Sequence, residues 1–388
     1  MLDLLDDGEI DGAKRRAVVS GCEAQVKTAI ASKGQGDVGL VALAEAAVAA
    51  DPKAIGFDAS GHATVTAAGR QFGAGRFEVL RLCELRSRAL TARARAGRPA
   101  AGRRLWVLDG ASPATDIGAL QATAAPGSMF QAASQFNCLE APGSFVVPIA
   151  EYLHDPTQGP RASISAFPGT LVRHYTAPAD DGSRFVQRTD AQQLDLLADV
   201  CDPGVAAVQN GYLRRTDIAQ PALFARALED RFESIAVGVH DDVEVVLGAD
   251  WAGAVDGPRT IAQVFTSTIA GGMYGGLDDD PVGAAICRQL QRAAYLGTLL
   301  AAAALGKRRV ALTLIGGGVF ANPMRTIWDA ILWASDQVVP FLRTDLSIIV
   351  NGRNLGAELP SRDLTAATFA RGGALIRFDR AGVTFADG

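Results

Sequence analysis

Residues 313–323 have the sequence TLIGGGVFANP, in which three glycines separate an apolar run from a proline. The apolar residues VALTLI at 310–315 predict a buried strand, and Asn322-Pro323 predicts the cap and first residue of a helix. A strand, a glycine loop and a helix in this order place unpaired backbone N–H groups and the positive end of a helix dipole at the carboxyl edge of a sheet. The stretch therefore predicts an anion site, and a diphosphate is the anion we expect.

The three glycines suit such a site. Gly316, Gly317 and Gly318 are expected to turn the main chain with positive φ and to approach phosphate oxygens without a Cβ in the way. The loop is not a P-loop, because no Gly-Lys-Ser or Gly-Lys-Thr follows, and it lacks the GxGxxG spacing of dinucleotide sites. A glycine loop can also do no more than connect a strand to a helix. The Asn-Pro helix start favours the ligand site.

The rest of the chain predicts an α/β fold. Short apolar segments predict further strands at 105–108, 130–137, 162–167, 205–208, 235–247, 261–269 and 346–350. The clearest helix is expected from Pro281 to Leu305, with Asp280 as its cap and Gly306 at its end. Strands that alternate with helices indicate a mixed, largely buried sheet flanked by helices.

A change of pattern near residue 100 predicts two regions. Residues 1–100 are expected to be a mainly helical accessory region, and residues 101–388 the α/β domain. The glycine, proline and arginine of ARAGRPAAGRR (94–104) mark the boundary between them.

Composition excludes several classes of protein. The formal net charge of −5 argues against a general nucleic-acid coat protein or a polybasic membrane binder. Five scattered cysteines, with no CxxC pair, indicate neither a disulfide framework nor a zinc motif, so we expect no metal site. The acidic N-terminus lacks the order of a signal peptide, and the longest apolar run, near 293–305, is too short to span a bilayer. A cytoplasmic protein with no membrane contact is expected.

Polar side chains gather in FQAASQFNCLE (130–140), at the end of an otherwise apolar predicted strand. Gln135, Asn137 and Glu140 would face the crevice where α/β proteins bind ligands. Asn137 could instead be a turn residue that caps its own backbone. Downstream, DPTQGPRASISAF (155–167) contains Gln158 and Gly159 and predicts either a lid over the ligand or a plain loop.

Two segments carry a resemblance to a known family. Residues 284–331, AAICRQLQRAAYLGTLLAAAALGKRRVALTLIGGGVFANPMRTIWDAI, look like the helix, strand, phosphate loop and next helix of the macrodomain family. Residues 134–140, SQFNCLE, look like the strand that ends in that family's ligand-contacting asparagine. Macrodomains recognise ADP-ribose, and some hydrolyse ADP-ribosyl bonds. A helical region before such a core resembles the poly(ADP-ribose) glycohydrolase branch.

The resemblance implies a macrodomain-like fold, with ADP-ribose or an ADP-ribosylated substrate as partner and no required cofactor. By position, Asn137 would hold the distal ribose, Phe320 would cover that sugar, and Asp116 would contact the adenine amino group. The complete implied ligand set is Asp116, Gln135, Asn137, Gln158, Gly159, Gly316, Gly317, Gly318, Val319, Phe320 and Asn322.

Cleavage at ribose C1 passes through an oxocarbenium-like state and calls for a carboxylic acid near the leaving group or a positioned water. Glu140 is the candidate acid, with Asn137 beside it as the second catalytic residue; the adjacent acidic pair of the glycohydrolase branch is absent. A solvated loop carboxylate would equally explain Glu140. Two other readings of the cleft stay open: a non-catalytic ADP-ribose reader, and an unrelated α/β protein that binds another nucleotide diphosphate.

Arginines are frequent from 76 to 104, at positions 76, 81, 86, 88, 93, 95, 98, 103 and 104. On a helix they would form a solvated face. The alternative is electrostatic contact between the Arg76–Arg104 segment and a polyanion, either nucleic acid or poly(ADP-ribose), which would weaken steeply as salt rises.

Overall fold

The structure is a computed structural model that describes residues 1–6, 9–97, 101–272, 280–353 and 355–386. Within these ranges eleven strands form one sheet. In sheet order they are β1 (Ile55–Phe57), β2 (Ala63–Ala67), β3 (Arg70–Arg81), β8 (Ala236–Glu244), β9 (Thr260–Thr266), β5 (Ser128–Ala133), β10 (Arg309–Leu312), β11 (Leu346–Asn351), β4 (Arg103–Asp109), β12 (Leu375–Asp379) and β13 (Gly382–Ala386). Two short strands, β6 (Ala177–Pro178) and β7 (Arg184–Phe185), pair separately.

The sheet is mixed, as the alternation of strands and helices predicts. All neighbouring pairs from β9 through β5, β10, β11 and β4 to β12 are parallel. The pairs from β1 to β9 at one edge, and β12 with β13 at the other, are antiparallel. The carboxyl ends of five parallel strands and of β12 therefore meet at one edge of the sheet, where α/β proteins place their ligands.

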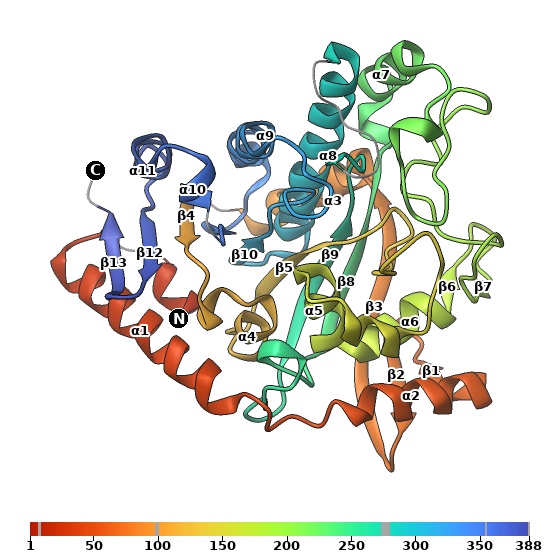
Figure 1. Cartoon of the computed structure of the whole chain (residues 1–388), viewed down its shortest axis with the longest axis horizontal. Coiled ribbons are helices and arrows are strands. Elements are labelled where there is room, and N and C mark those ends of the chain that lie inside the picture. Colours follow the sequence, from red (N-terminus) through yellow and green to blue (C-terminus); the bar gives the residue numbers. More distant parts are fainter. Residues whose placement is uncertain (7–8, 98–100, 273–279, 354, 387–388) are drawn as a thin grey trace.

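Helices cover both faces of the sheet. They are α1 (Gly12–Ser32), α2 (Gly39–Ala50), α3 (Leu82–Ala96), α4 (Ile117–Ala122), α5 (Gln158–Ser165), α6 (Phe167–Tyr175), α7 (Pro221–Asp230), α8 (Pro281–Leu305), α9 (Met324–Gln337), α10 (Leu355–Glu358) and α11 (Ser361–Phe369). Figure 1 shows α3, α8 and α9 on one side of the sheet and α1, α4, α5 and α6 on the other. This confirms the predicted mixed sheet flanked by helices.

Helix α8 has the bounds that its sequence predicts. The Asp280 side chain accepts a hydrogen bond from the backbone N–H of Val282 at 3.0 Å, and Pro281 occupies the first turn. Gly306 ends the helix with a left-handed φ of 67°, a conformation that glycine adopts without a steric penalty. Local signals therefore suffice to define both ends of α8.

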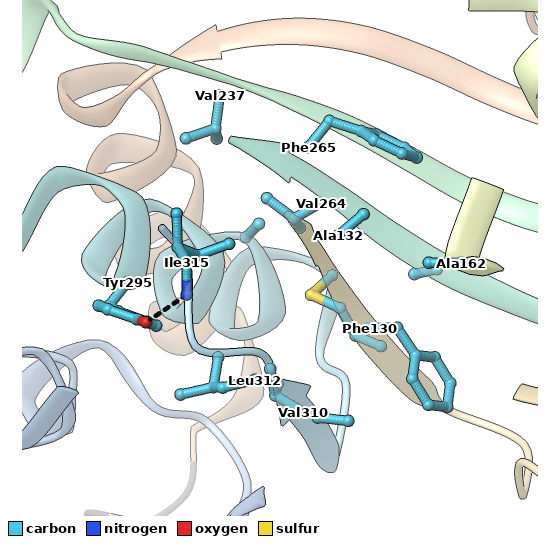
Figure 2. Packing of buried hydrophobic residues seen from close by; sticks show 14 of the residues in the cluster. Phe130, Ala132, Ala162, Val237, Val264, Phe265, Tyr295, Val310, Leu312 and Ile315 are labelled. Carbon is cyan, nitrogen blue, oxygen red and sulfur yellow. Dashed lines mark hydrogen bonds between the residues drawn. The ribbon is translucent and has the colours of Figure 1, made fainter. Parts of the chain in front are cut away.

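The core lies where α8 packs on the central strands. Figure 2 shows Phe130, Val264 and Val310, which come from the neighbouring strands β5, β9 and β10. All three side chains are fully buried. Helices cover these strands on both faces, so the strands consist of continuous apolar runs, and this is why the sequence reveals them.

The expectation of a mainly helical stretch over residues 1–100 is wrong for residues 55–81. They form β1, β2 and β3, and β3 pairs with β8, so the sheet continues on both sides of the predicted boundary. In β2 the buried Ala63, Val65 and Ala67 alternate with threonines, the period of two that marks a strand with one covered face. The boundary itself was placed near residues 98–100, which lie outside the described residues.

Two predicted strands are also absent. Residues 162–167 form the end of α5 and the start of α6, and they are buried on all sides, so their apolar run did not distinguish a helix from a strand. Residues 205–208 are irregular except for a single bridge between Ala206 and Ile218.

Candidate functional site

A cleft of about 600 Å³ crosses the carboxyl ends of four neighbouring strands. Ser267 follows β9, Ser134 follows β5, Thr313 follows β10, and Asn351 ends β11, and all four residues line the cleft. Neighbouring strands lie about 4.8 Å apart, so these four ends form a row roughly 14 Å long. The cleft is long enough for an extended ligand rather than a single compact group.

The glycine loop forms one wall of the cleft. Gly316 alone of the three glycines has a positive φ, 73°, so the expected positive φ at Gly317 and Gly318 is wrong. The Asn322 backbone N–H donates to the Gly316 carbonyl at 2.9 Å and closes the loop. Among the described residues, the N–H groups of Gly318 and Val319 have no hydrogen-bond acceptor, so they remain available to a ligand in the cleft.

Helix α8 anchors the chain that enters this loop. The Tyr295 hydroxyl donates to the Thr313 carbonyl at 2.9 Å and accepts from the Ile315 N–H at 3.0 Å, and Figure 2 shows the second contact. The Gln291 amide donates to the Ile315 carbonyl at 2.7 Å. Because Tyr295 and Gln291 are fully buried, these contacts hold the start of the loop on a rigid element.

The start of α5 forms the opposite wall. Gln158, Gly159 and Pro160, in its first turn, line the cleft. The N–H groups of a first helical turn have no acceptor within the helix, and the helix dipole adds partial positive charge there. This segment is a helix N-terminus, so the expected plain loop is wrong for residues 158–165, and its role as a lid stays a prediction. Pro160 has no N–H and the Arg161 N–H donates to the Thr157 carbonyl, so Gln158 and Gly159 are the residues whose N–H groups this wall can contribute.

Glu140 provides an acid at the bottom of the cleft. Its side chain is 5% exposed and lines the cleft, and Oε1 accepts a hydrogen bond from the Ser163 hydroxyl at 3.4 Å. Burial raises the pKa of this carboxyl well above 4.5, the positive charge of Arg173 opposes the rise, and the charge of Asp155 adds to it. Burial therefore extends the neutral, protonated form of Glu140 to higher pH than in a solvent-exposed glutamate.

Other charged and polar groups extend along the cleft. Asp155 lies on its wall near Glu140, while Arg353 and Glu358 lie near the end of β11. The Asn351 amide nitrogen donates to the Thr115 carbonyl at 2.8 Å. Its oxygen Oδ1 is buried and has no hydrogen-bond partner among the described residues. Asn351 therefore keeps an unused hydrogen-bond acceptor beside the cleft.

The structure brings most of the predicted site residues together. Those that line the cleft are Gln135, Glu140, Gln158, Gly159, Gly316, Gly317, Gly318, Val319 and Phe320. The Phe320 ring lies 5.9 Å from the ring of Tyr212, which also lines the cleft. Gln135 is nearly buried, and its Oε1 has no partner in the described part of the chain.

Three predicted residues do not line the cleft. Asn137 is fully buried; its Oδ1 accepts from the Leu139 N–H at 3.0 Å and its Nδ2 donates to Gln193 at 2.9 Å, so it is the turn residue of the alternative interpretation. Asp116 caps α4 and forms an ion pair with Arg161.

Asn322 is the third. Its side chain donates to the Ile269 carbonyl at 3.0 Å and so holds the glycine loop from behind. It is not the cap of α9, because Pro323 occupies that position and the helix begins at Met324. In Asn137 and Asp116, contacts within the protein use the polar atoms that the sequence assigned to a ligand, whereas Asn322 Oδ1 is buried and has no partner in the described part of the chain.

Asp155, Tyr212, Asn351 and Arg353 line the cleft but were not among the predicted site residues. The sequence contained a pattern that predicts one of these four residues. Asn351 follows the predicted strand LSIIV, and the reasoning that selected Asn137 at the end of a strand applies equally to it. Asp155, Tyr212 and Arg353 lie in loops whose approach to the cleft depends on tertiary packing.

Most arginines of the Arg76–Arg104 segment have acidic partners. The pairs are Arg76 and Arg88 with Glu78, Arg81 with Asp199, Arg86 with Glu233, and Arg103 with Asp336. Arg98 lies outside the described residues. These ion pairs reduce the positive potential that the run of arginines suggests.

Membrane-spanning helices and metal-binding clusters are both absent from the described parts of the chain. No helix there has both the length and the apolar character needed to cross a membrane. No group of three or more histidine, cysteine or acidic side chains there is arranged to hold a metal ion.

Together the fold and the cleft define a mixed α/β protein with a ligand site at the carboxyl ends of its parallel strands. The sequence matches no family model and no curated protein. The solved structures that resemble it include a mutant poly(ADP-ribose) glycohydrolase from Thermomonospora curvata, with a TM-score of 0.39 and 15% identity over 86% of this chain and 99% of that chain. The glycohydrolase from Deinococcus radiodurans in complex with ADP-ribose has a TM-score of 0.39 and 12% identity over 75% of this chain and 94% of that chain.

Proposed function

We propose that this protein binds ADP-ribose in the cleft and hydrolyses the bond at ribose C1 of an ADP-ribosylated protein, nucleic acid or small molecule. One observation carries the proposal: a single cleft contains both the free amides of the glycine loop and the buried carboxyl of Glu140. The first suits a diphosphate and the second suits acid catalysis beside it.

The diphosphate would lie between the two walls of the cleft. The Gly318 and Val319 N–H groups on one side and the Gln158 and Gly159 N–H groups on the other would donate to its oxygens. Neither wall contributes a basic side chain, so recognition depends on fixed backbone dipoles. Such donors are already oriented and cost little entropy when the ligand binds.

The two ends of the cleft differ in chemistry, and this assigns the direction of the ligand. At the β11 end, Asn351 Oδ1 can accept a hydrogen bond from the adenine amino group, the role first assigned to Asp116. At the β5 end, Glu140 and Asp155 lie near the distal ribose, with the Phe320 ring beside that sugar. The reacting C1 atom would therefore lie at the Glu140 end.

The reaction needs one proton donor and one proton acceptor. Neutral Glu140 would donate its proton to the leaving atom as the bond between that atom and C1 breaks. Water would then form the new C1–O bond, and Asp155 would accept the proton that this water loses. Atoms and charge balance with water as the only co-reactant, so this scheme requires no cofactor.

The test combines binding with product analysis. Calorimetry with ADP-ribose, NAD and ATP in parallel should give the tightest binding for ADP-ribose, and a preference for ATP would overturn the ligand assignment. Mass spectrometry should then detect free ADP-ribose when the protein is mixed with an ADP-ribosylated protein. Tight binding without release, unchanged by Glu140→Gln, would identify a reader rather than a hydrolase.

A polyanion contact through Arg76–Arg104 would be a separate property of this protein. Because most of those arginines are already paired, we propose that its contribution to substrate binding is small. Binding of a poly(ADP-ribose) chain should then weaken much less than the roughly 10³-fold loss that six phosphate contacts give between 50 and 200 mM salt. A loss of that size would instead favour an extended polyanion site.

A further inference from the structure

A fully buried arginine lies behind the proposed catalytic acid. We propose that Arg173, acting through Ser163, is a positioning residue that fixes one carboxyl oxygen of Glu140 and leaves the other toward the cleft as the proton donor. This inference rests on the proposed function for its catalytic consequence. The arrangement of the three side chains is independent of that function.

The hydrogen bonds that connect Arg173 with Glu140 each have a defined donor and acceptor. The Arg173 guanidinium, on α6, donates from Nη2 to the Ser163 hydroxyl at 3.2 Å and to the Thr170 hydroxyl at 3.0 Å. An arginine has no acceptor, so Ser163 Oγ must accept from it. The single hydroxyl hydrogen of Ser163 is then directed at Oε1 of Glu140, 3.4 Å away.

We place the proton of the neutral Glu140 carboxyl on Oε2, because Oε1 already accepts from Ser163. Oε2 lies beside Gly159, where a Cβ would overlap it, and Gly159 lines the cleft. The acidic proton is therefore held on the side from which a substrate approaches.

Arg173 also holds the backbone that leads to Glu140. Its Nε donates to the Cys138 carbonyl at 3.1 Å. Cys138 has a positive φ of 61°, which is unfavourable for a residue with a side chain and persists only where surrounding contacts stabilise it. The same guanidinium thus contacts both the turn before Glu140 and the hydroxyl that orients its side chain.

The other two partners of Arg173 do not neutralise it: its guanidinium carbon lies 3.5 Å from the centre of the Phe265 ring, and its Nη1 contacts His240. His240 Nε2 lies 2.6 Å from the Ala74 carbonyl, an acceptor, so Nε2 carries the hydrogen and Nδ1 can accept from Arg173 Nη1 at 3.3 Å. Burial and the charge of Arg173 lower the pKa of His240 well below 6.5, so the ring is neutral. In the described residues no carboxylate forms an ion pair with Arg173. Its charge is available to offset the negative charge that Glu140 acquires on proton transfer.

Several elements packed around Glu140 contribute groups that influence its pKa, and the Ser134 hydroxyl after β5 lowers this pKa as Ser163 does. Tyr152 precedes the loop with Asp155 and accepts a hydrogen bond from the Glu140 N–H at 3.2 Å; Asp155 adds negative charge. Cys138 lies two residues before Glu140, and burial raises the pKa of its thiol to about 12, so it stays neutral. Arg173 is the one cation among the influences on Glu140, and Ser163 connects the two.

The decisive variant is Ser163→Ala, with Ser165→Ala as its matched control. Both serines are fully buried on α5, but the Ser165 hydroxyl donates to the Leu247 carbonyl and does not contact Glu140. The titration of Glu140 is followed by ¹³C NMR of carboxyl-labelled glutamate, and its signal is assigned by its absence in Glu140→Gln. This measurement needs no substrate, so it remains informative even where the proposed function fails.

Loss of the Ser163 hydrogen bond removes a contact that favours the charged carboxyl. The pKa of Glu140 should therefore rise by about one unit in Ser163→Ala. In Ser165→Ala it should stay at the wild-type value. In the hydrolysis assay Ser163→Ala should lower kcat by about tenfold and leave the Kd for ADP-ribose within about twofold. An unchanged Glu140 titration in Ser163→Ala would overturn the inference.

Arg173→Lys tests the cation itself and is measured only below its thermal unfolding transition. Lysine keeps the charge but cannot contact Ser163, Thr170 and Cys138 at once from a planar group. We expect a shifted Glu140 titration and a loss of kcat that exceeds the loss in Ser163→Ala. A wild-type titration in a folded Arg173→Lys protein would remove Arg173 from the proposal, whether or not the protein releases ADP-ribose.

Discussion

Gly159 contacts the carboxyl of Glu140 so closely that no side chain fits between them. A Cβ added to Gly159 would overlap both Oε2 of Glu140 and the carbonyl oxygen of Ala133. The first turn of α5 can therefore approach the end of β5 only because residue 159 is a glycine. This contact brings a helix N-terminus and an acid to the same point of the cleft.

Gly159→Ala should consequently displace Glu140. We expect a loss of about 1–3 kcal/mol in the free energy of unfolding, the usual cost of an overpacked site, together with loss of ADP-ribose release. Gly143→Ala is the control, because a Cβ there meets nothing within 4 Å. Urea unfolding and the release assay provide both quantities. Wild-type stability and release in Gly159→Ala would contradict the contact.

Gly318→Ala should separate ligand binding from folding. A Cβ at Gly318 meets no protein atom within 4 Å and its φ is ordinary, so the free energy of unfolding should fall by less than about 0.5 kcal/mol or rise slightly. The same Cβ would project beside the free amide and weaken ADP-ribose binding by about tenfold or more. Calorimetry measures the affinity of the variant for ADP-ribose. An unchanged affinity would show that the diphosphate does not bind beside Gly318.

Gly316→Ala is the comparison for that variant. Gly316 has a φ of 73°, and a Cβ there would overlap the side chains of Asn322 and Thr268. It should lower the free energy of unfolding by more than about 1 kcal/mol, because both the strain and the overlap are costs within the protein. Equal effects of Gly316→Ala and Gly318→Ala on stability would contradict the positive φ and the close contacts of Gly316.

Glu140→Gln should lower kcat by roughly 10²- to 10⁴-fold with little change in ADP-ribose affinity, because it removes a proton donor and preserves the shape of the side chain. In the wild type, release should slow as pH rises through the elevated pKa of Glu140. Rate measurements from pH 5 to 9 test this. A release rate that instead rises across that range would exclude Glu140 as the acid.

The same variant predicts a change in the pH dependence of stability. The pKa of Glu140 is raised on folding, so its contribution to stability is fully present below about pH 4.5 and is lost as pH rises through the folded-state value. Glu140→Gln removes that dependence. Relative to the wild type, the variant should therefore gain stability as pH rises from 4 to 8. Parallel curves of unfolding free energy against pH for the two proteins would contradict a raised pKa of the buried Glu140 carboxyl.

Tyr295→Phe should weaken the support of the glycine loop. The change removes the Tyr295 contacts with the Ile315 N–H and the Thr313 carbonyl, which keep only their 3.1 Å hydrogen bond to each other, so the free energy of unfolding should fall by about 1 kcal/mol. ADP-ribose affinity should fall as well, since these residues lead into the loop. Tyr175→Phe, which removes a hydroxyl bound to Glu45, should affect stability without affecting affinity.

Glu45 on α2 connects the N-terminal region to the cleft. Its carboxylate accepts hydrogen bonds from the N–H groups of Ile149 at 2.6 Å and Ala150 at 3.0 Å, at the start of the 3₁₀ helix Ile149–His154 that carries Tyr152. Glu45→Ala should lower the free energy of unfolding by about 3 kcal/mol, because it leaves buried donors unpaired. The exposed Glu23→Ala should change it by less than about 0.5 kcal/mol. Thermal and urea unfolding of the two variants provide the comparison.

Local patterns predicted the elements whose signals lie within one segment. Helix α8 has a capping aspartate, an initial proline and a terminal glycine, and these residues act within a turn of each helix end. The buried strands β4, β5, β9, β10 and β11 are apolar along their length because helices cover both of their faces. The strand β10 and the glycine loop after it were predicted from these patterns alone.

Local sequence patterns did not predict which side chains point into the cleft. Asn137 and Glu140 lie three residues apart in the same loop, yet only Glu140 reaches the cleft. Asn137 is enclosed by Gly211, where a Cβ would overlap its amide, and it is paired with Gln193. Both partners are more than fifty residues away in the chain, so no local signal distinguishes the two side chains.

The amino-acid sequence by itself determined the mixed α/β class, the long helix α8 and the position of the glycine loop, because propensity, capping and hydrophobic period act between residues close in the chain. Only the tertiary structure decided that Glu140 meets Gly159, that Asn351 lines the cleft while Asp116 pairs with Arg161, and that Arg173 lies behind Glu140. Those outcomes depend on how segments distant in the chain pack together. They also depend on which buried polar groups form hydrogen bonds inside the protein, and only the complete fold determines those partners.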